Sequence, residues 1–215
     1  MLLALDTATR SISLALHDGQ SVLAEHTWRT ADHHTVELAP NTERLLNRAN
    51  VEPHSLSAIA VALGPGSYTG LRIGLGFAKG LSLANNIPLI GVPTFEILLH
   101  ATAPRPETVL TVLQAGRGRV SAAAYRWQAG WQAVGPMRVI DWKTLAADIS
   151  EPTWVCGEVD DAGRAALQSR ADLVTVASPA HALRRAGHLA EIGWQRLRGQ
   201  RLDAAGALAP IYGGA

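Results

Sequence analysis

Charged residues are scarce in this chain of 215 residues, making up 17% of it, whereas an average soluble domain has roughly a quarter. Hydrophobic residues reach 47%, a composition that excludes both an intrinsically disordered segment and a coiled coil. The formal net charge is only +1, so the chain lacks the basic footprint that independent nucleic-acid binding requires. The low charge indicates either a large buried fraction or an apolar surface that a partner covers.

Cysteine and long apolar runs are lacking as well. The single cysteine, Cys156, excludes an internal disulfide and stands where a buried strand is expected to end. No run approaches the ~18 apolar residues that a membrane-spanning helix needs. The N-terminal stretch 1–6 has no positively charged segment before its apolar residues, unlike a signal peptide. We therefore expect a soluble, cytoplasmic protein without a membrane association.

The first half of the chain alternates between strand and helix patterns. Two-residue periodicity and the Asp18–Gly19 turn predict three antiparallel strands at the start, and a later apolar run predicts a strand buried on both faces. The expected strands are 2–5, 11–17, 20–28, 57–63 and 89–92, and the expected helices are 35–50, about 70–84 and 95–101. Pro40 predicts either a kink in the first helix or a start later than Thr35.

The pattern then begins again in a shorter form. The proline-containing stretch 103–106 is the expected boundary between two lobes, 1–103 and 104–215. Beyond it, strand patterns at 108–114, 119–127, 131–139, 153–156 and 173–176 alternate with helix patterns at 142–148, 160–169 and 179–197. We predict a duplicated α/β fold with a complete N-terminal lobe and a reduced C-terminal lobe, the last helix being free to pack back on the first lobe.

The most unusual stretch runs from Gly64 to Gly80. It lacks the Gly-Lys-Ser/Thr of a P-loop, and Gly70 comes one residue too late for a dinucleotide-binding fingerprint. What remains is a strand, a tight turn with Ser67 and a helix N-terminus, which can hold an anion. Asp6 and Thr7, at the end of the first strand, are open to two interpretations: contact with a metal–phosphate group, or ordinary turn chemistry.

The helix that follows the glycine turn is apolar on two sides. Gly70, Gly74 and Phe77 share one face, and Leu71 and Leu75 lie on another. Each interior glycine costs roughly 1 kcal/mol relative to alanine, so their number indicates a close approach between backbones. One side faces its own sheet. The other is covered either by the helix at 35–50 or by a partner protein.

No local signature of catalysis is present in the sequence. The eight histidines form neither an i,i+4 pair nor a His-Glu-x-x-His arrangement, and Ser67 is not placed as in a nucleophile elbow. The residues alone therefore give no support for catalysis or for a metal site.

Four segments of the first hundred residues stand in a distinctive order and spacing. They are Asp6-Thr7-Ala8-Thr9, His34-Thr35, Gly64-Pro65-Gly66-Ser67-Tyr68-Thr69-Gly70-Leu71-Arg72-Ile73-Gly74 and Ile90-Gly91-Val92-Pro93-Thr94. Together they closely resemble the TsaB (YeaZ) family of the bacterial threonylcarbamoyladenosine pathway. The match is dense to about residue 100 and thin beyond it.

This resemblance implies an actin-like fold of the sugar-kinase and Hsp70 type and a subunit that is not itself the catalyst. In that pathway the paralogue TsaD transfers threonylcarbamoyl to the adenosine next to the anticodon of tRNAs that read codons beginning with A, and the ATPase TsaE completes the assembly. The resemblance further implies pairing with a TsaD-like subunit, or a homodimer when alone, and contact with tRNA only through the complex. The chain is expected to require no cofactor, and ATP or ADP is expected, if anywhere, at the complex interface.

Two sets of site residues are expected, and no catalytic or metal-binding residue: the partner-binding set follows from the glycine-rich helix and the resemblance, and the cofactor-binding set from the strand-end and helix-N-terminus chemistry described above. The expected partner-binding residues, from the first two helices, are Leu38, Leu45, Gly70, Ile73, Gly74 and Phe77. The expected cofactor-binding residues are Asp6, Thr7 and Ser67.

Two departures from the family pattern weaken a nucleotide-binding role for the second lobe. Gln114-Ala115-Gly116 stands where many relatives have Asp-Ala-Arg, and Gly214 stands where many have an arginine after Pro210 and Tyr212.

Two other functions remain as alternatives. One is a metallopeptidase-like enzyme of the glycoprotease type, which metal analysis and a protease assay would reveal. The other is a small kinase of the same fold, which would need phosphate contacts in both lobes.

Overall fold

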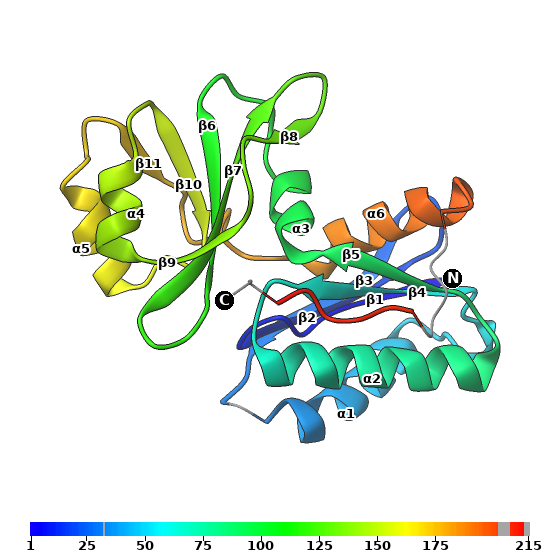
Figure 1. Cartoon of the computed structure of the whole chain (residues 1–215). Helices are drawn as coiled ribbons and strands as arrows, with labels where there is room; N and C mark the ends of the chain where they lie inside the picture. Colours follow the sequence, from blue (N-terminus) through cyan, green and yellow to red (C-terminus); the bar gives the residue numbers. More distant parts are fainter. Residues whose placement is uncertain (32, 202–206, 213–215) are drawn as a thin grey trace.

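The first five strands form one mixed sheet in the computed structural model, which describes residues 1–31, 33–201 and 207–212 (Figure 1). The strand order is β3-β2-β1-β4-β5, with β1–β2 and β2–β3 antiparallel and β1–β4 and β4–β5 parallel. The strands are β1 (Leu2–Asp6), β2 (Ser11–His17), β3 (Val22–Arg29), β4 (Ala58–Gly64) and β5 (Leu89–Pro93).

Helices cover both faces of this sheet, so β1 and β4 are buried along their whole length. On one face Leu3 and Leu5 meet α1 (His34–Arg48) and α2 (Tyr68–Asn85). On the other face Leu2 and Ala4 meet α6 (Ala186–Arg198). Successive side chains of a strand point to opposite faces of the sheet. Because both faces are covered here, the sequences of β1 and β4 are apolar without interruption.

The second sheet repeats the strand order of the first. Read from its far edge it runs β8-β7-β6-β10-β11, again with two antiparallel and two parallel pairings, and β9 pairs with β7 beside β8. The strands are β6 (Thr108–Gln114), β7 (Arg119–Trp127), β8 (Trp131–Ala133), β9 (Arg138–Asp141), β10 (Thr153–Gly157) and β11 (Val174–Val176). The core on one face is completed by α4 (Trp142–Asp148) and α5 (Asp161–Gln168).

Two helices join the halves. Helix α3 (Thr94–His100) packs Phe95, Leu98 and Leu99 against the second sheet and Ile97 against the first. Helix α6 follows the last strand of the second sheet but returns to the first sheet, where Leu189 and other residues bury against it (Figure 1). The two sheets are therefore connected both by the packing of α3 and by the returning chain of α6, which meet in one core on the same face of the first sheet.

The C-terminal segment 207–212 lies along α2 and the edge of the first core. Ile211 N donates to the carbonyl oxygen of Leu63 (2.6 Å), and Lys79 Nζ on α2 donates to the carbonyl oxygen of Leu208 (2.8 Å). Leu208 is itself part of the core beneath α2. The segment therefore covers one flank of α2.

The predicted α/β fold is confirmed, and the differences are local. Helix α1 begins at His34 and continues through Pro40, so the alternative of a later start is wrong. The last helix begins at Ala186 rather than near residue 179, and the expected strand 131–139 is two strands, β8 and β9. Within the described ranges, the helices are all too short or too polar to cross a membrane.

Candidate functional site

A cleft of about 600 Å³ lies where the two halves of the chain meet. Its walls come from the turn after β1, the N-terminus of α2, the ends of β6 and β10, and the segment that leads to α6. Polar side chains are prominent in it, among them Thr9, Ser67, Gln114, Glu158 and Asp160. This is the position at which an open α/β architecture most often holds a ligand, outside the carboxyl ends of its parallel strands.

The guanidinium of Arg184 ties the first half of the chain to the second beside this cleft. Its Nε donates to Asp6 Oδ2 at the end of β1 (2.9 Å), and its Nη1 donates to Glu158 Oε1 just after β10 (3.2 Å). Its Nη2 donates to Thr9 Oγ1 (2.6 Å) and to the carbonyl oxygen of Ser11 (3.3 Å). Arg184 and Asp6 are each 1% exposed in their side chains, so this ion pair is fully buried.

The guanidinium of Arg184 is stabilised in its charged form. Burial by itself would lower the pKa of Arg184, but the nearby carboxylates of Asp6 and Glu158 outweigh that effect and raise it. Removing one partner of a buried ion pair leaves the other charged and unpaired, at a cost of about 3–5 kcal/mol. The network therefore fixes the strand ends of both sheets against each other.

These contacts do not fit a metal–phosphate group at Asp6. Oδ2 is bound by Arg184, and Oδ1 accepts a hydrogen bond from the backbone N of Ala8 (2.8 Å). The carboxylate is thus neutralised by an internal cation in the place where a bound cation would be needed. Across the described ranges there is also no group of three or more His, Cys, Asp or Glu that could hold a metal ion. The expectation that Asp6 binds a cofactor is corrected accordingly.

The other two expected cofactor-binding residues have different positions. Thr7 is fully buried, and its hydroxyl donates to the carbonyl oxygen of Gly70 (2.8 Å) rather than facing the cleft, so it too is corrected to a structural role. Ser67 lines the cleft, and its hydroxyl oxygen accepts from the backbone N of Gly70 (3.2 Å) as the N-cap of α2. Of the three, only Ser67 is available to a ligand in the cleft.

The glycines at the start of α2 allow the turn after β1 to pack directly on that helix. A Cβ on Gly70 would lie 2.2 Å from the carbonyl oxygen of Thr7, and one on Gly74 would lie 2.0 Å from Thr7 Oγ1. Both distances are far shorter than a normal van der Waals contact, so only glycine fits. The close backbone approach inferred from the sequence is present, but it joins α2 to the β1 turn rather than to another helix.

Burial divides the expected partner-binding residues into two groups. Four of them are inside the protein: Leu38, Leu45, Gly70 and Gly74. The two leucines belong to the core between α1, α2 and the first sheet, and the two glycines face Thr7, so none of the four can touch a partner of the folded chain. The other two, Ile73 and Phe77, are half-buried and pack on the rim of that core.

The outer side of α2 carries an open strip of which the sequence interpretation selected only Ile73. Around Gly76 and Gly80 no atom comes within 4 Å of the position of an added Cβ, and Leu83 is 85% exposed. We call Ile73, Gly76, Gly80, Leu83 and Ala84 the α2 strip. They share one side of the helix, because residues four apart lie above one another. The strip is small and apolar in character.

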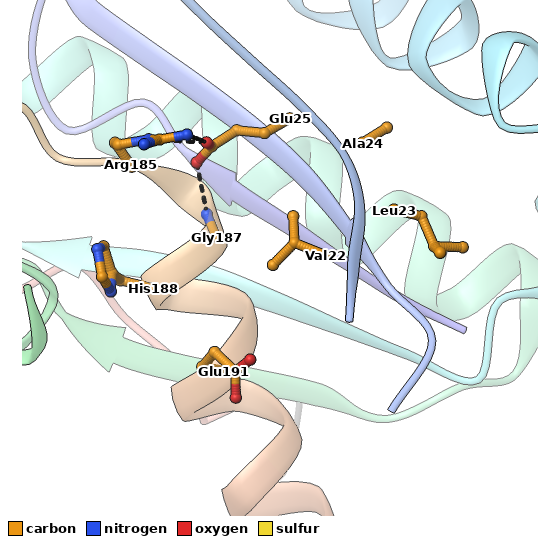
Figure 2. A pocket seen from close by; sticks show the side chains of 8 residues that line it. All are labelled: Val22, Leu23, Ala24, Glu25, Arg185, Gly187, His188 and Glu191. Carbon is orange, nitrogen blue, oxygen red and sulfur yellow. Dashed lines mark hydrogen bonds and ion pairs between the residues drawn. The ribbon is translucent and has the colours of Figure 1, made fainter. Parts of the chain in front are cut away.

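A second hollow, of about 440 Å³, lies between β3 and α6 (Figure 2). The carboxylate of Glu25 accepts from the backbone N of Gly187 (2.8 Å) and from Arg185 Nε (2.8 Å), so it fixes the N-terminus of α6. On the same helix Glu191 pairs with the buried His17 (3.0 Å). Because these charges are engaged in holding α6 on the first sheet, we assign this hollow a structural role.

Of the positions that bear on the family pattern, Gln114, which departs from it, and Tyr212, which matches it, both make internal contacts. Gln114 Nε2 donates to the carbonyl oxygen of Glu158 (3.2 Å) at the cleft, which links the ends of β6 and β10. The Tyr212 hydroxyl accepts a hydrogen bond from Arg72 Nε on α2 (3.0 Å). Gly214 lies outside the described residues.

Two sheets with the same strand order, parted by a cleft, define the actin-like class of α/β proteins. In agreement with this, component A of (R)-2-hydroxyglutaryl-CoA dehydratase from Acidaminococcus fermentans superposes with a TM-score of 0.54 at 12% identity, over 92% of this chain and 98% of that one. At such low identity the likeness shows the fold alone.

Three comparisons identify the family within this class. A model described as TsaD, tRNA N6-adenosine threonylcarbamoyltransferase, matches residues 22–140. The Bacillus subtilis tRNA threonylcarbamoyladenosine biosynthesis protein TsaB is 32% identical over 160 residues, which cover 73% of this chain and 70% of that protein. The structure of YeaZ from Pseudomonas aeruginosa superposes with a TM-score of 0.78 at 25% identity over 98% of both chains. The chain belongs to the TsaB (YeaZ) family and takes part in tRNA threonylcarbamoyladenosine biosynthesis.

The first prediction concerns the buried ion network. Replacing Arg184 by methionine leaves two carboxylates without their cation, so we expect the free energy of unfolding to fall by about 3–5 kcal/mol. Asp6→Asn in the same background should cost less than it does alone, because the two changes remove one interaction. Urea unfolding followed by circular dichroism measures both effects.

The control for this prediction is Arg138→Met. Arg138 pairs with Asp148 at the surface (2.7 Å), where both side chains are about half exposed, and such pairs contribute about 1 kcal/mol or less. Equal losses for Arg138→Met and Arg184→Met would contradict the assigned role of Arg184.

The second prediction compares two glycines of α2. Gly74→Ala should destabilise the protein by about 1–3 kcal/mol, because the new methyl group overlaps Thr7. Gly76→Ala should stabilise it by about 0.5–1 kcal/mol, because its methyl group meets open space and alanine is the better helix former. Denaturant midpoints of the two variants, at constant slope, decide the matter. A shift in the same direction for both would mean that the contacts of Thr7 do not constrain α2.

Proposed function

We propose that this chain is a non-catalytic subunit of the assembly that forms threonylcarbamoyladenosine next to the anticodon of tRNAs reading codons that begin with A. In this proposal a TsaD-type subunit carries out the transfer, and a TsaE-type ATPase joins the same assembly. The chain binds the TsaD-type subunit through the α2 strip, and forms a homodimer through the same surface when alone. The observation that carries the proposal is the α2 strip, an open surface of small and apolar residues on a helix whose inner side packs on its own sheet.

The cleft supports a non-catalytic role. The strand-end carboxylate of Asp6 is held by Arg184 and by a backbone N, and Thr7 is turned into the packing with α2. An acid, a metal ligand or a phosphate contact at this place would require the network to open. Opening the network would cost about 3–5 kcal/mol, which is a large part of the free energy of unfolding of a typical single domain.

The α2 strip supports the partner-binding role. Glycine at positions 76 and 80 removes the side chains that otherwise keep packed helices 8–10 Å apart, so a partner helix can approach the backbone closely. Leu83 on the strip and Val36 on the neighbouring α1 are 85% and 68% exposed, so each of the two helices presents an exposed apolar side chain. Helix α1 flanks one side of the strip, and the C-terminal segment flanks the other (Figure 1). A pair of helices presented in this way suits a helix-on-helix contact.

The low net charge of the chain supports the proposal that it contacts tRNA only as part of the complex. Nucleic-acid affinity depends on many phosphate contacts from basic residues, and a net charge of +1 supplies few of them. In this proposal the chain works in the cytoplasm and requires no cofactor of its own. Any ATP or ADP of the assembly would lie at the interface of the subunits.

The third prediction tests the interface. Gly80→Trp should raise the dissociation constant for the TsaD-type subunit by roughly 100-fold or more, because the ring occupies the centre of the strip. The fold should be unaffected, since no atom lies within 4 Å of the new Cβ. Size-exclusion chromatography and titration calorimetry with the partner measure binding, and circular dichroism verifies the fold.

The matched control is Gly135→Trp, which adds the same ring at another open glycine, in the second half of the chain. It should bind as the unaltered chain does. Formation of threonylcarbamoyladenosine in a reconstituted system should follow binding, and the isolated chain should form none. A folded Gly80→Trp chain that binds normally would place the interface elsewhere, and turnover by the isolated chain would refute the non-catalytic role.

A further inference from the structure

A third cavity, of about 360 Å³, has a different set of lining residues from the cleft and the α2 strip, although the loop 178–183 borders both the cavity and the cleft. It is enclosed by the segment after α3, by β10, by the edge strand β11 and by the loop that follows β11. Its polar wall comes from Thr102, Arg105, Ser178 and His181, and the ring of Trp154 forms part of an apolar wall. Neither the packing of the fold nor the proposed partner contact explains why these polar side chains are gathered in one cavity.

Among the described residues, Arg105 has no acidic side chain in an ion pair with it. Its guanidinium stacks over the ring of Trp154 at 4.0 Å from the centroid. Its Nε and Nη1 are buried and have no hydrogen-bond partner among the residues that the structure describes. A buried donor that is left unpaired costs about 1–3 kcal/mol, and more when it carries charge. Arginine N–H groups in this situation are usually paired with an anion.

The neighbouring thiol does not supply that anion. Burial raises the pKa of Cys156 to about 12, although a hydrogen bond with Thr102 and the positive charge of Arg105 act to lower it. Cys156 is therefore a neutral thiol at physiological pH. None of the described residues that line the cavity is acidic, so its potential is set by Arg105.

Two further donors stand at the exposed rim of the cavity. Ser178 Oγ and His181 Nδ1 are 2.9 Å apart, and both residues are exposed. Whichever of them donates in this hydrogen bond, the pair keeps an N–H or O–H group that can turn to a ligand. A cation beneath an aromatic ring, with polar donors at the rim and no carboxylate, matches the requirements of an oxyanion.

We propose that this cavity binds a small oxyanion, either a carboxylate or a phosphate group, which is held by Arg105 and contacted at the rim by Ser178 and His181. The anion supplies the counter-charge that Arg105 lacks, and its oxygens accept hydrogen bonds from the guanidinium. The volume of the cavity admits a small molecule that carries such a group. This site is independent of the α2 strip, so its test does not depend on the outcome of the partner-binding experiments.

The fourth prediction tests this site with inorganic phosphate and acetate as probes, each titrated into the full chain against chloride at constant ionic strength. Saturating anion should raise the melting temperature by about 3 °C or more, because a ligand of the folded state stabilises it by mass action. A response to phosphate at lower concentration than acetate identifies a phosphoryl ligand, and the reverse order identifies a carboxylate. Calorimetric titration provides the dissociation constants.

Two variants connect the response to the site. Arg105→Met keeps an aliphatic stem over Trp154 but removes the charge, and should abolish the shift. Ser178→Ala, at the exposed rim, should weaken binding about tenfold without affecting the fold, the loss expected of one hydrogen bond to a charged ligand. Arg119→Met, which removes an exposed arginine from β7 of the same sheet, should leave the shift unchanged. The absence of a shift with both anions, or equal shifts with Arg105→Met and the unaltered chain, would overturn the proposal. If Arg105→Met fails to fold, an unaltered response of Ser178→Ala overturns it.

Discussion

The buried contact between Arg184 and the carboxylates of Asp6 and Glu158 is the interaction on which the arrangement of this protein depends. Asp6 ends the first strand of one sheet, and Glu158 follows a parallel strand of the other, so a single guanidinium holds equivalent edges of both sheets. Almost no water reaches it, and its charge is compensated only by these partners. In an actin-like fold this is the region in which a ligand would normally bridge the lobes. Here a side chain of the protein makes the bridge.

The same turn that carries Asp6 also determines how α2 lies. Thr7 follows Asp6 directly and packs into the space left by Gly70 and Gly74, while its hydroxyl bonds to the first turn of the helix. The inner side of α2 is therefore buried against its own sheet, and the outer side, with Gly76 and Gly80, is open. The engaged Asp6 carboxylate beside the cleft and the open strip on α2 thus both follow from the turn after β1.

Much of the fold could be predicted from the sequence, because strand and helix periodicities are local properties. The apolar run of β4 and the hairpin turn at Asp18–Gly19 are sufficient to place those elements. The number of glycines in α2 correctly indicated a close backbone approach. It could not indicate the partner in that approach, which for Gly74 is the turn after β1 and not a second helix. In the same way, the apolar stripe with Leu38 and Leu45 has the pattern of a buried helix face, whether its own sheet or another protein covers it.

The candidate site was less accessible to prediction. Arg184 lies far from Asp6 along the chain, and an arginine before a helix has no periodicity or spacing that marks it as buried. For Glu158 the sequence offered only a weak indication of a site. It follows a buried strand in the second half of the chain, much as Asp6 ends a buried strand in the first half. The turn and helix start around Ser67 were visible in the sequence, and the structure has Ser67 as the N-cap of α2, whereas its expected contact with a ligand stays a prediction. Contacts that join distant segments are determined by the tertiary fold.

The central claim is that the chain acts through the outer side of α2 while the buried ion network beside its cleft stays intact. Amide hydrogen exchange of the full chain, measured with and without the TsaD-type subunit, tests this most directly, because it reports protection segment by segment. The account predicts that binding protects amides of α1 and α2 and leaves those around Gln114, Glu158 and Arg184 unchanged. Protection confined to the segments that line the cleft, with no change in α2, would contradict it.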